Sequence, residues 1–278
     1  MKNKPVNSNS DNNPEADGSA QGVGLLVKAF QILDLFTDAR PSWTQAELVR
    51  ETSLPRSTLG RLVRFLAARG YLFDEHGRYR LGFAAVDLGR RAQVQFNLVD
   101  LLDDLLEYLA QTTGETVMLT AYDEAQSRVV CLAQIPSRQG GLRVFENVGA
   151  AFPLHCGASS KAVLAFLPQK QIDTVLMGDL RPFNQQAKAR SVEELRTEIH
   201  AIQTCGYTIS HEETYPGVAG FGVPILTPGG RPLGSFAVAA PLQRTDDANV
   251  EHYLEQLRHV ASQSSLRLSG RGAPLNGE

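Results

Sequence analysis

Residues 44–81 constrain the fold of this chain most, because the sequence there marks the starts and ends of two short helices. Thr44 and Glu47 have the spacing of a capping box, in which each side chain satisfies a backbone N–H of the other residue. Pro55 suits the first position of a second helix, and Gly70 can adopt the left-handed conformation that ends one. The sequence therefore predicts two helices joined by a tight turn, the arrangement of a helix-turn-helix.

The second of these helices has two faces of different character. Its apolar residues form one stripe at helical spacing, which we expect to pack inward: Leu59, Leu62, Val63 and Leu66. The opposite face carries Ser57, Gly60, Arg61 and Arg64, with Arg56 near the helix start. The major groove of DNA admits one helix, and arginine can donate two hydrogen bonds to guanine. The pattern therefore predicts a helix that reads duplex DNA.

Gly60 is unusual in a helix interior, where glycine costs roughly 1 kcal/mol relative to alanine. We interpret it as a point where the backbone approaches a sugar or a base edge. The alternative for the whole face is an ordinary solvated helix surface that happens to carry arginines.

A charged hairpin is predicted after the second helix. Residues 71–73 and 78–81 read as strands around a turn at 74–77. From residue 54 to residue 80 there are six arginines, no lysine and two acidic residues, although the whole chain has a net charge of −3. This local positive charge predicts a wing that contacts the DNA backbone or minor groove. The residues that we expect to contact DNA are Thr44, Pro55, Arg56, Ser57, Thr58, Gly60, Arg61, Arg64, Arg78 and Arg80.

Length and composition predict two domains and no membrane segment. A chain of 278 residues with 42% hydrophobic content can hold two modest cores. No apolar run approaches the roughly 18 residues that suggest a membrane helix, and the N-terminus lacks the apolar core of a signal peptide. We therefore expect a cytoplasmic protein without membrane contact. Residues 1–21 are too polar to bury anything and are predicted to form a disordered arm.

The three cysteines are Cys131, Cys156 and Cys205. An odd number without CxxC spacing argues against a disulfide framework and against a zinc finger, so we expect reduced thiols. One alternative is a metal site in which His155 and Cys156 are joined by Cys131 or His211. A buried thiol beside a helix start is the commoner explanation, and we expect no metal.

Two further helical patterns flank the helix-turn-helix. Leu26, Ala29, Phe30 and Leu33 mark a first helix that completes a three-helix core. Residues 83–113 read as helix with few breakers, and the portion 94–109 is strongly apolar. We expect a linker helix whose spare apolar face forms an oligomer contact, because paired DNA half-sites favour a two-fold dimer. The alternative is that this face packs on its own C-terminal domain.

Beyond Gly114 the pattern is mixed. Strands are predicted at 116–122, 128–135, 142–146, 207–211, 221–226 and 232–239. Helices are predicted at 157–167, after Pro168, at 191–205 behind a second capping box, and around 250–260. Hairpin-linked strands with flanking helices predict an α+β domain around an antiparallel sheet.

Several separated motifs resemble the IclR family of transcriptional regulators over roughly residues 22–268. The segments 54–58 with 61–62 resemble its recognition helix, 77–82 its wing, and 113–117 the entry to its effector domain. Further matches are 153–155 with 161–165, 206–207, and 212–213 before 216–218. Their shared order identifies the chain as a member of that family.

The resemblance implies a winged helix-turn-helix joined by a linker helix to a GAF-like or profilin-like effector-binding domain. It also implies a dimer or tetramer that binds an operator and acts as a repressor or an activator. We expect an arm over 1–21, the DNA-binding domain over 22–84, the linker over 85–100, the effector domain over 101–268 and a flexible tail over 269–278.

In that family a small molecule, often an organic or aromatic acid, sits in the C-terminal domain and alters transcription. The positions that match its pocket are Gly157, Ala158, Ser159, Ser210, Gly220 and the strand Ala237, Val238 and Ala239. A helix start at the first three favours an anion. Ser210 stands where an acid is common, and alanines replace two serines at 237–239. We therefore expect a bulkier, partly apolar or aromatic carboxylate, with Met118, Phe145 and Phe221 as walls or as ordinary core.

Two other classes of function are weighed against this one. An enzyme is not expected, because the chain has no Ser-x-x-Lys at 159–161, no Gly-x-Ser-x-Gly elbow, and no phosphate-loop lysine after 217–222. No cofactor is expected either. The remaining alternative is a DNA-binding protein whose C-terminal domain only oligomerises, without a ligand.

Overall fold

The computed structural model describes residues 14–37, 39–95, 98–139 and 147–270. The chain divides into two compact units, Met1–Gln95 and Phe96–Glu278. We describe each unit by itself.

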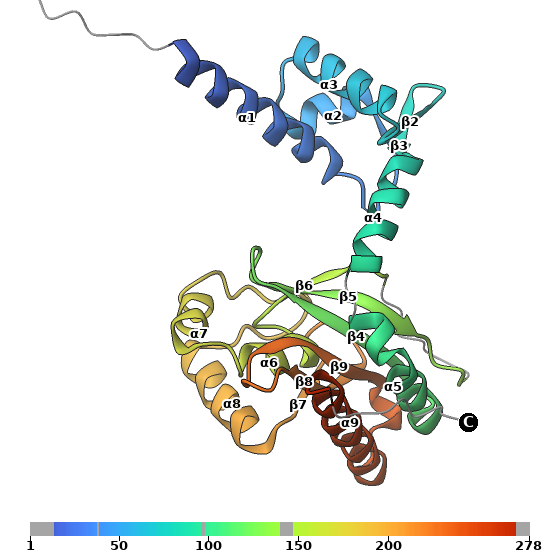
Figure 1. Cartoon of the computed structure of the whole chain (residues 1–278), viewed down its shortest axis with the longest axis vertical. Coiled ribbons are helices and arrows are strands. Elements are labelled where there is room, and N and C mark those ends of the chain that lie inside the picture. The colour runs from blue at the N-terminus through green and yellow to red at the C-terminus, as the bar shows by residue number, and fades with distance from the viewer. Residues whose placement is uncertain (1–13, 38, 96–97, 140–146, 271–278) are drawn as a thin grey trace, which may run out of the picture. The chain divides into compact units, whose positions relative to one another are not determined.

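The N-terminal unit is a three-helix core with a small sheet. It contains α1 (Pro14–Leu33), α2 (Gln45–Thr52), α3 (Arg56–Ala68) and α4 (Phe83–Gln95), with strands β1 (Trp43–Thr44), β2 (Leu72–Glu75) and β3 (Arg78–Leu81) (Figure 1). The predicted apolar stripe of α3 is buried, and its residues share one core with α1, α2 and β2: Ile32, Phe36, Trp43, Leu48, Leu54, Leu59, Leu62, Val63, Leu66 and Leu72. The winged helix-turn-helix is confirmed.

The predicted helix ends are confirmed with one shift at Pro55. The backbone N–H of Thr44 donates to Glu47 Oε2 at 2.7 Å, and the backbone N–H of Glu47 donates to Thr44 Oγ1 at 3.3 Å, so both halves of the capping box are present. Pro55 is the residue before α3 rather than its first residue, with φ −54° and ψ 136°. Gly70 has φ 76° after the end of α3, as its lack of a Cβ allows.

The wing has a tighter turn than the sequence predicted. Its strands run on to Glu75 and restart at Arg78, so only His76 and Gly77 form the turn, with φ 54° and 81°. Two successive residues with positive φ match the right-handed twist of a hairpin. Strand β1 pairs with β3, which gives the order β1-β3-β2.

The first helix begins earlier than the sequence predicted. Helix α1 starts at Pro14, inside the segment 1–21 that we expected to be disordered. Proline is favoured in the first turn of a helix, and Glu15 and Ala16 are good helix formers, so the helix pattern can extend ahead of Leu26.

The C-terminal unit is built on a six-stranded antiparallel sheet with the order β6-β5-β4-β9-β8-β7. The strands are β4 (Thr116–Asp123), β5 (Arg128–Ile135), β6 (Ala151–Pro153), β7 (Thr208–His211), β8 (Val218–Leu226) and β9 (Pro232–Pro241). The helices are α5 (Leu98–Thr113), α6 (Ala158–Leu164), α7 (Gln169–Leu176), α8 (Val192–Cys205), the short η1 (Leu242–Arg244) and α9 (Asp247–Leu268). This arrangement confirms the predicted α+β class with an antiparallel sheet.

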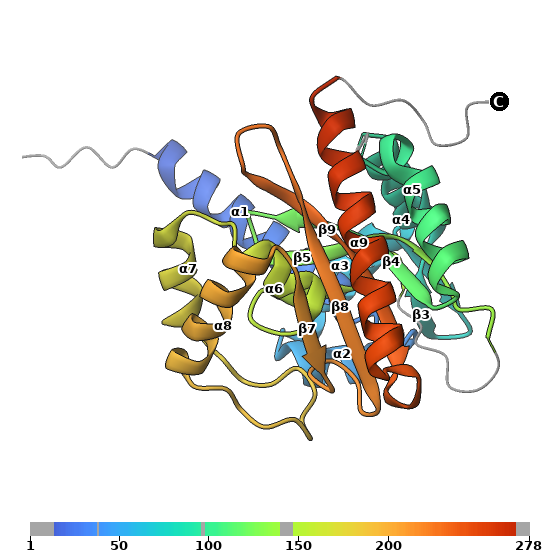
Figure 2. The same cartoon turned by 90° about the horizontal axis from the view of Figure 1, so that it is seen from below.

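Helices cover both faces of this sheet (Figure 2). Along β8, Ala219, Phe221 and Val223 point to the face that α5 and α9 cover. Side chains alternate along a strand, so residues 218, 220 and 222 belong to the other face. Helix α6 packs on that second face, against β8 and β9.

The apolar stripe of α5 packs within its own unit. Leu102, Leu105, Leu106 and Leu109 are at most 1% exposed and belong to one core with the sheet and α9. The buried Arg267 of α9 also donates to Asp104 and to the backbone oxygen of Leu101, at 2.9 Å. The buried stripe of α5 thus packs on its own C-terminal domain, as the alternative had it, and the oligomer contact that we expected for the portion 94–109 stays a prediction.

Two glycines let α6 lie directly on β8. A Cβ on Gly222 would come within 2.7 Å of the backbone oxygen of Ala158, and one on Gly220 within 3.2 Å of the Ala158 Cβ. The edge strand β6 was not predicted. The strand predicted at 142–146, with Phe145, lies outside the described residues.

Candidate nucleic-acid interface and ligand pocket

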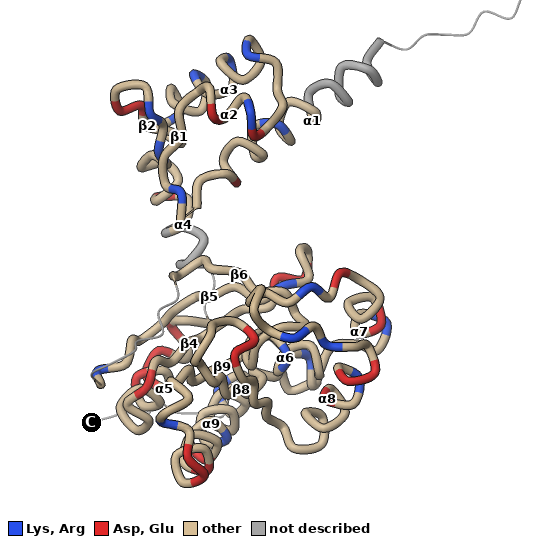
Figure 3. Tube along the Cα trace, turned by 180° about the vertical axis from the view of Figure 1, so that it is seen from behind, with Lys and Arg blue, Asp and Glu red and all other residues tan. Residues whose placement is uncertain are grey.

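The outer face of α3 presents arginines to solvent. Arg56, Arg61 and Arg64 are exposed, and none of them pairs with a carboxylate among the residues that the structure describes. The Nε of Arg64 donates to the backbone oxygen of Gly60 at 3.1 Å, which holds its guanidinium against its own helix. Ser57 is exposed beside them and Thr58 is half-buried. Figure 3 shows the basic positions along α3 and at the wing.

The wing arginines have partners within the protein. Arg78 donates from Nε to Ser42 Oγ at 3.3 Å, and Arg80 forms an ion pair with Glu75 on the neighbouring strand. The hydroxyl of Thr44 lies 2.8 Å from Glu47 Oε2 within the capping box. These side chains are less available to DNA than Arg56 and Arg61.

Gly60 lies close to one side chain of the neighbouring helix. A Cβ at this position would lie 3.0 Å from Nε2 of Gln45, at the start of α2. That atom is the end of a flexible side chain, which can move aside, so the approach of Gly60 to DNA stays a prediction.

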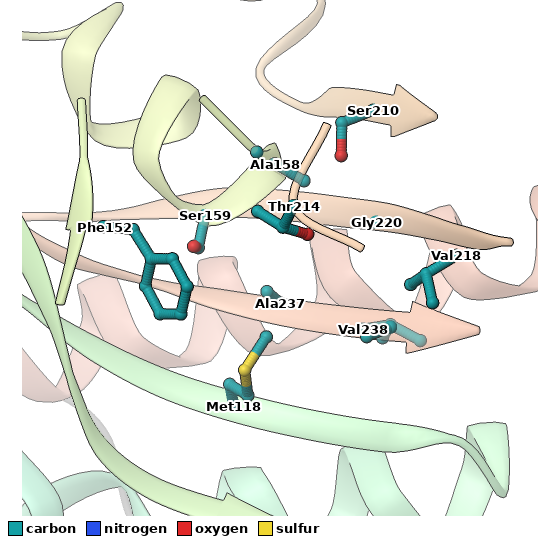
Figure 4. Close-up of a pocket in the computed structure, with 12 residues that line it drawn as sticks. Met118, Phe152, Ala158, Ser159, Ser210, Thr214, Val218, Gly220, Ala237 and Val238 are labelled. Atoms are coloured by element: carbon teal, nitrogen blue, oxygen red, sulfur yellow. The ribbon is translucent and has the colours of Figure 1, made fainter. Parts of the chain in front are cut away.

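A small pocket lies on the α6 face of the sheet in the C-terminal unit (Figure 4). Strands β4, β6, β7, β8 and β9 supply its walls together with the start of α6 and the loop after β7. Its lining residues are Met118, Phe152, Gly157, Ala158, Ser159, Ser210, Thr214, Val218, Gly220, Ala237, Val238 and Ala239.

Most of the predicted pocket residues come together here. The exceptions are Phe145, which lies outside the described residues, and Phe221. Phe221 is fully buried on the opposite face of the sheet, where its ring lies 5.4 Å from that of Tyr253. Placing it in the pocket was wrong because Gly220 and Phe221 are adjacent on a strand and point to opposite faces.

The sequence reasoning missed Phe152, Thr214 and Val218. Phe152 directly precedes the family-like segment 153–155, and Thr214 directly follows Glu212 and Glu213. Phe152 comes from the unpredicted edge strand β6 and Thr214 from the loop after β7, so sequence proximity to these motifs was the available signal.

The pocket is apolar with a few hydroxyl groups. Met118, Phe152 and Ala237 supply carbon and sulfur surface, and in Figure 4 the first two side chains approach each other beside Ala237. Ser159, Ser210 and Thr214 provide hydroxyls, and none of the described residues that line the pocket is charged. The cavity measures about 30 Å³. That is room for a water molecule or two rather than for an organic ligand.

A cluster of ion pairs around one buried lysine lies beside the pocket. Lys161 of α6 is 1% exposed, and its ammonium group donates to Glu213 at 2.6 Å and to Glu198. Arg190 donates to the second oxygen of Glu198 at 2.9 Å. Two cations and two carboxylates balance one another, which a buried lysine requires.

Glu213 joins this cluster to the pocket wall. Its Oε2 accepts the backbone N–H of Gly157 at 2.8 Å, directly before α6. A Cβ on Gly157 would lie 2.8 Å from Cγ2 of Thr214, and Gly157 has φ 80°, so both space and conformation favour glycine there. The cluster therefore fixes the loop that places Thr214 in the pocket.

The residues weighed as a metal site have other surroundings. His155 Nε2 lies 3.0 Å from the backbone oxygen of Arg181, and burial raises the pKa of the Cys156 thiol. In the described parts of the chain, no group of three or more His, Cys, Asp and Glu side chains is arranged to hold a metal ion. Helices long and apolar enough to cross a membrane are likewise absent from those parts.

A winged helix-turn-helix followed by an α+β domain with a pocket defines a class of DNA-binding transcriptional regulators. Within that class, residues 25–73 match the IclR helix-turn-helix domain, and residues 91–266 match the bacterial transcriptional regulator IclR C-terminal domain. Because the second match alone spans more than half of the chain, this protein belongs to the IclR family. The family is one of transcriptional regulators and not of enzymes.

Individual proteins of this family are similar to this chain over most of their length. The HTH-type transcriptional regulator KipR of Bacillus subtilis is 26% identical, over 87% of this chain and 96% of KipR. The IclR regulator structure from Alicyclobacillus acidocaldarius has a TM-score of 0.76 at 22% identity, over 88% of this chain and 98% of that one. An IclR homologue from Microbacterium hydrocarbonoxydans was solved in complex with 4-hydroxybenzoate. Its structure has a TM-score of 0.74 at 22% identity, over 88% of this chain and 99% of that one.

The variant Gly60→Ala tests whether Gly60 lies against DNA. Because the tip of Gln45 can move aside, we expect the free energy of unfolding to rise by up to about 1 kcal/mol, the gain in helix propensity of alanine over glycine. Affinity for a selected DNA duplex should change by no more than about twofold. Urea unfolding and fluorescence anisotropy measure the two quantities.

The double variant Gln45→Ala, Gly60→Ala is the matched control, since it removes the close neighbour. A loss of DNA affinity in both variants without a loss of stability would support the prediction that the backbone at Gly60 contacts DNA.

Proposed function

We propose that this protein binds an operator through α3 and the wing, and that a small organic or aromatic acid in the C-terminal pocket modulates this binding. The observation that carries the proposal is the pocket itself, in which separated family-like positions on β7, β8, β9 and the start of α6 meet around one space. We propose a catabolic operon as the target and the cytoplasm as the location. Two of the relatives are named as repressors, which supports repression as the direction.

The lining supports a flat, partly apolar effector. Methionine and phenylalanine form favourable contacts with rings, and the hydroxyls of Ser159, Ser210 and Thr214 can donate to a carboxylate or a phenol. The Microbacterium homologue holds 4-hydroxybenzoate, a ligand of this kind. The family-like placement of the pocket supports the same class of ligand here.

Binding such a ligand requires the pocket to open. Ligand sites usually measure about 300 Å³ or more, against about 30 Å³ here. Met118 and Phe152 are the side chains that we expect to move. Methionine is unbranched and flexible, and Phe152 lies on the three-residue edge strand β6, where its ring is 5.3 Å from that of Phe183.

Calorimetry with a panel of ring carboxylates, beginning with 4-hydroxybenzoate, tests the effector role. We expect saturable heat from at least one compound and a matching change in operator affinity. Ala158→Trp should abolish both responses, because an indole at the start of α6 blocks the space into which the pocket must open. Affinity for the operator without effector should stay near that of the wild type, and circular dichroism checks that the variant is folded.

Met177→Trp is the matched control, because it adds the same side chain at a position that is 84% exposed. An undiminished response in Ala158→Trp would refute the pocket assignment. No heat from the whole panel would favour the alternative in which this domain only oligomerises.

We also propose that the protein acts as a homodimer or tetramer through exposed apolar residues of the N-terminal unit. On α1 these residues follow helical spacing, and α4 adds more: Val23, Leu26, Val27, Phe30, Phe83, Val86 and Leu88, each between 49% and 86% exposed. An apolar surface of this kind is typical of a protein contact. A two-fold dimer would present two copies of α3 to successive major grooves.

The variant Phe30→Glu tests this assembly. A carboxylate at a position that is 62% exposed leaves the fold intact but would be buried without a partner in the dimer. We expect a smaller assembly in sedimentation velocity and weaker binding to a paired half-site, whereas Met177→Glu should leave both unchanged. A monomeric wild type, or an unchanged Phe30→Glu assembly, would contradict the proposal.

A further inference from the structure

Phe65 stands out on α3 because it is a large aromatic side chain on the solvent side. The other large apolar residues of this helix are buried, at 0% to 8% exposed. Phe65 is 61% exposed and lies outside the core of its unit. Packing of the N-terminal unit therefore gives no reason for a phenylalanine here.

The neighbours of Phe65 point to the partner it meets. Arg61 precedes it by one helical turn, and a helical side chain leans back over the preceding turn, so Phe65 covers surface next to Arg61. Arg64 is adjacent in sequence, and both arginines are exposed without a carboxylate partner. An apolar protein surface would leave these charges buried and unpaired, whereas the major groove supplies acceptors for them.

We propose that Phe65 reads thymine, by packing its ring against the 5-methyl group of that base in the major groove. Among the four base pairs, the thymine methyl is the one apolar group exposed in that groove, and phenylalanine is a side chain that contacts it. Phe65 thus adds apolar specificity to the hydrogen bonds that Arg61 can make.

The helix geometry gives the spacing of the two contacts. Four residues rise by about 6 Å along a helix axis, and successive base pairs are about 3.4 Å apart. For a helix that lies along the groove, the thymine read by Phe65 lies about two base pairs from the base pair read by Arg61.

Thymine-to-uracil substitution tests this assignment directly, because uracil lacks only the methyl group. A preferred duplex is first selected from random sequences with the full-length wild-type protein. Each thymine of the selected site is then replaced by uracil in turn, and affinity is measured by fluorescence anisotropy at one salt concentration.

For the wild type we expect one uracil position per half-site to weaken binding about fourfold. This is the change for one buried methyl-sized group at about 0.8 kcal/mol, since about 1.4 kcal/mol corresponds to tenfold. Phe65→Ala should lose that difference between thymine and uracil entirely. Phe73→Ala, which removes a ring that is 56% exposed on β2, should keep it.

Three results would overturn the proposal. They are a wild type indifferent to uracil at every position of the site, a uracil effect of equal size in Phe65→Ala, and a Phe65→Ala variant that changes the assembly state instead of base preference. The last would assign Phe65 to a protein contact. Failure of the wild type to select any sequence would refute operator binding as a whole, and circular dichroism checks that Phe65→Ala is folded.

Discussion

The close packing of α6 on β8 is the contact on which the ligand pocket depends. It requires a strand without side chains at two positions, Gly220 and Gly222, because a Cβ at either would press on Ala158. It also requires the Glu213 carboxylate, which accepts the N–H of Gly157 and pairs with buried Lys161. Backbone proximity and a balanced set of buried charges therefore fix the pocket walls together, while Met118 and Phe152 close the space between them.

In the N-terminal unit, one face of α3 packs on the core and the opposite face is available for DNA recognition. The buried stripe of α3 holds the helix on its core, and the capping box at Thr44 fixes the start of α2 beside it. The same constraint leaves the arginines on the outer face without carboxylate partners among the described residues. Coupling between the units requires the effector to bind DNA-competent and DNA-incompetent arrangements unequally. The residues that close the pocket are the ones that a ligand must displace, so they are the natural origin of such a difference.

Most of the fold could be predicted because its signals lie in short stretches of sequence. The rest depends on contacts between segments that are far apart in the chain, which the sequence pattern does not show. Capping boxes, glycines at helix ends and apolar periodicity are local, and the helices and strands that they predicted are largely found. The direction in which an apolar face packs is not local, so the α5 stripe was assigned to an oligomer and Phe221 to the pocket. Phe152 reaches the pocket from the unpredicted edge strand β6, and Thr214 reaches it through the loop that the Glu213 contacts hold. The close neighbour of Gly60, Gln45, lies on another helix, so the pattern of α3 does not show it.

Operator binding by Arg61→Ala, compared with Arg69→Ala, tests most directly whether the outer face of α3 enters the groove. Both variants remove one exposed positive charge from α3 or its end, so their general electrostatic losses are alike. The account predicts that Arg61→Ala weakens binding to the selected duplex by about 1 to 3 kcal/mol, with relaxed preference at one base position if Arg61 reads guanine. Arg69→Ala should cost less and leave every preference unchanged. Unchanged operator affinity in Arg61→Ala would contradict the account.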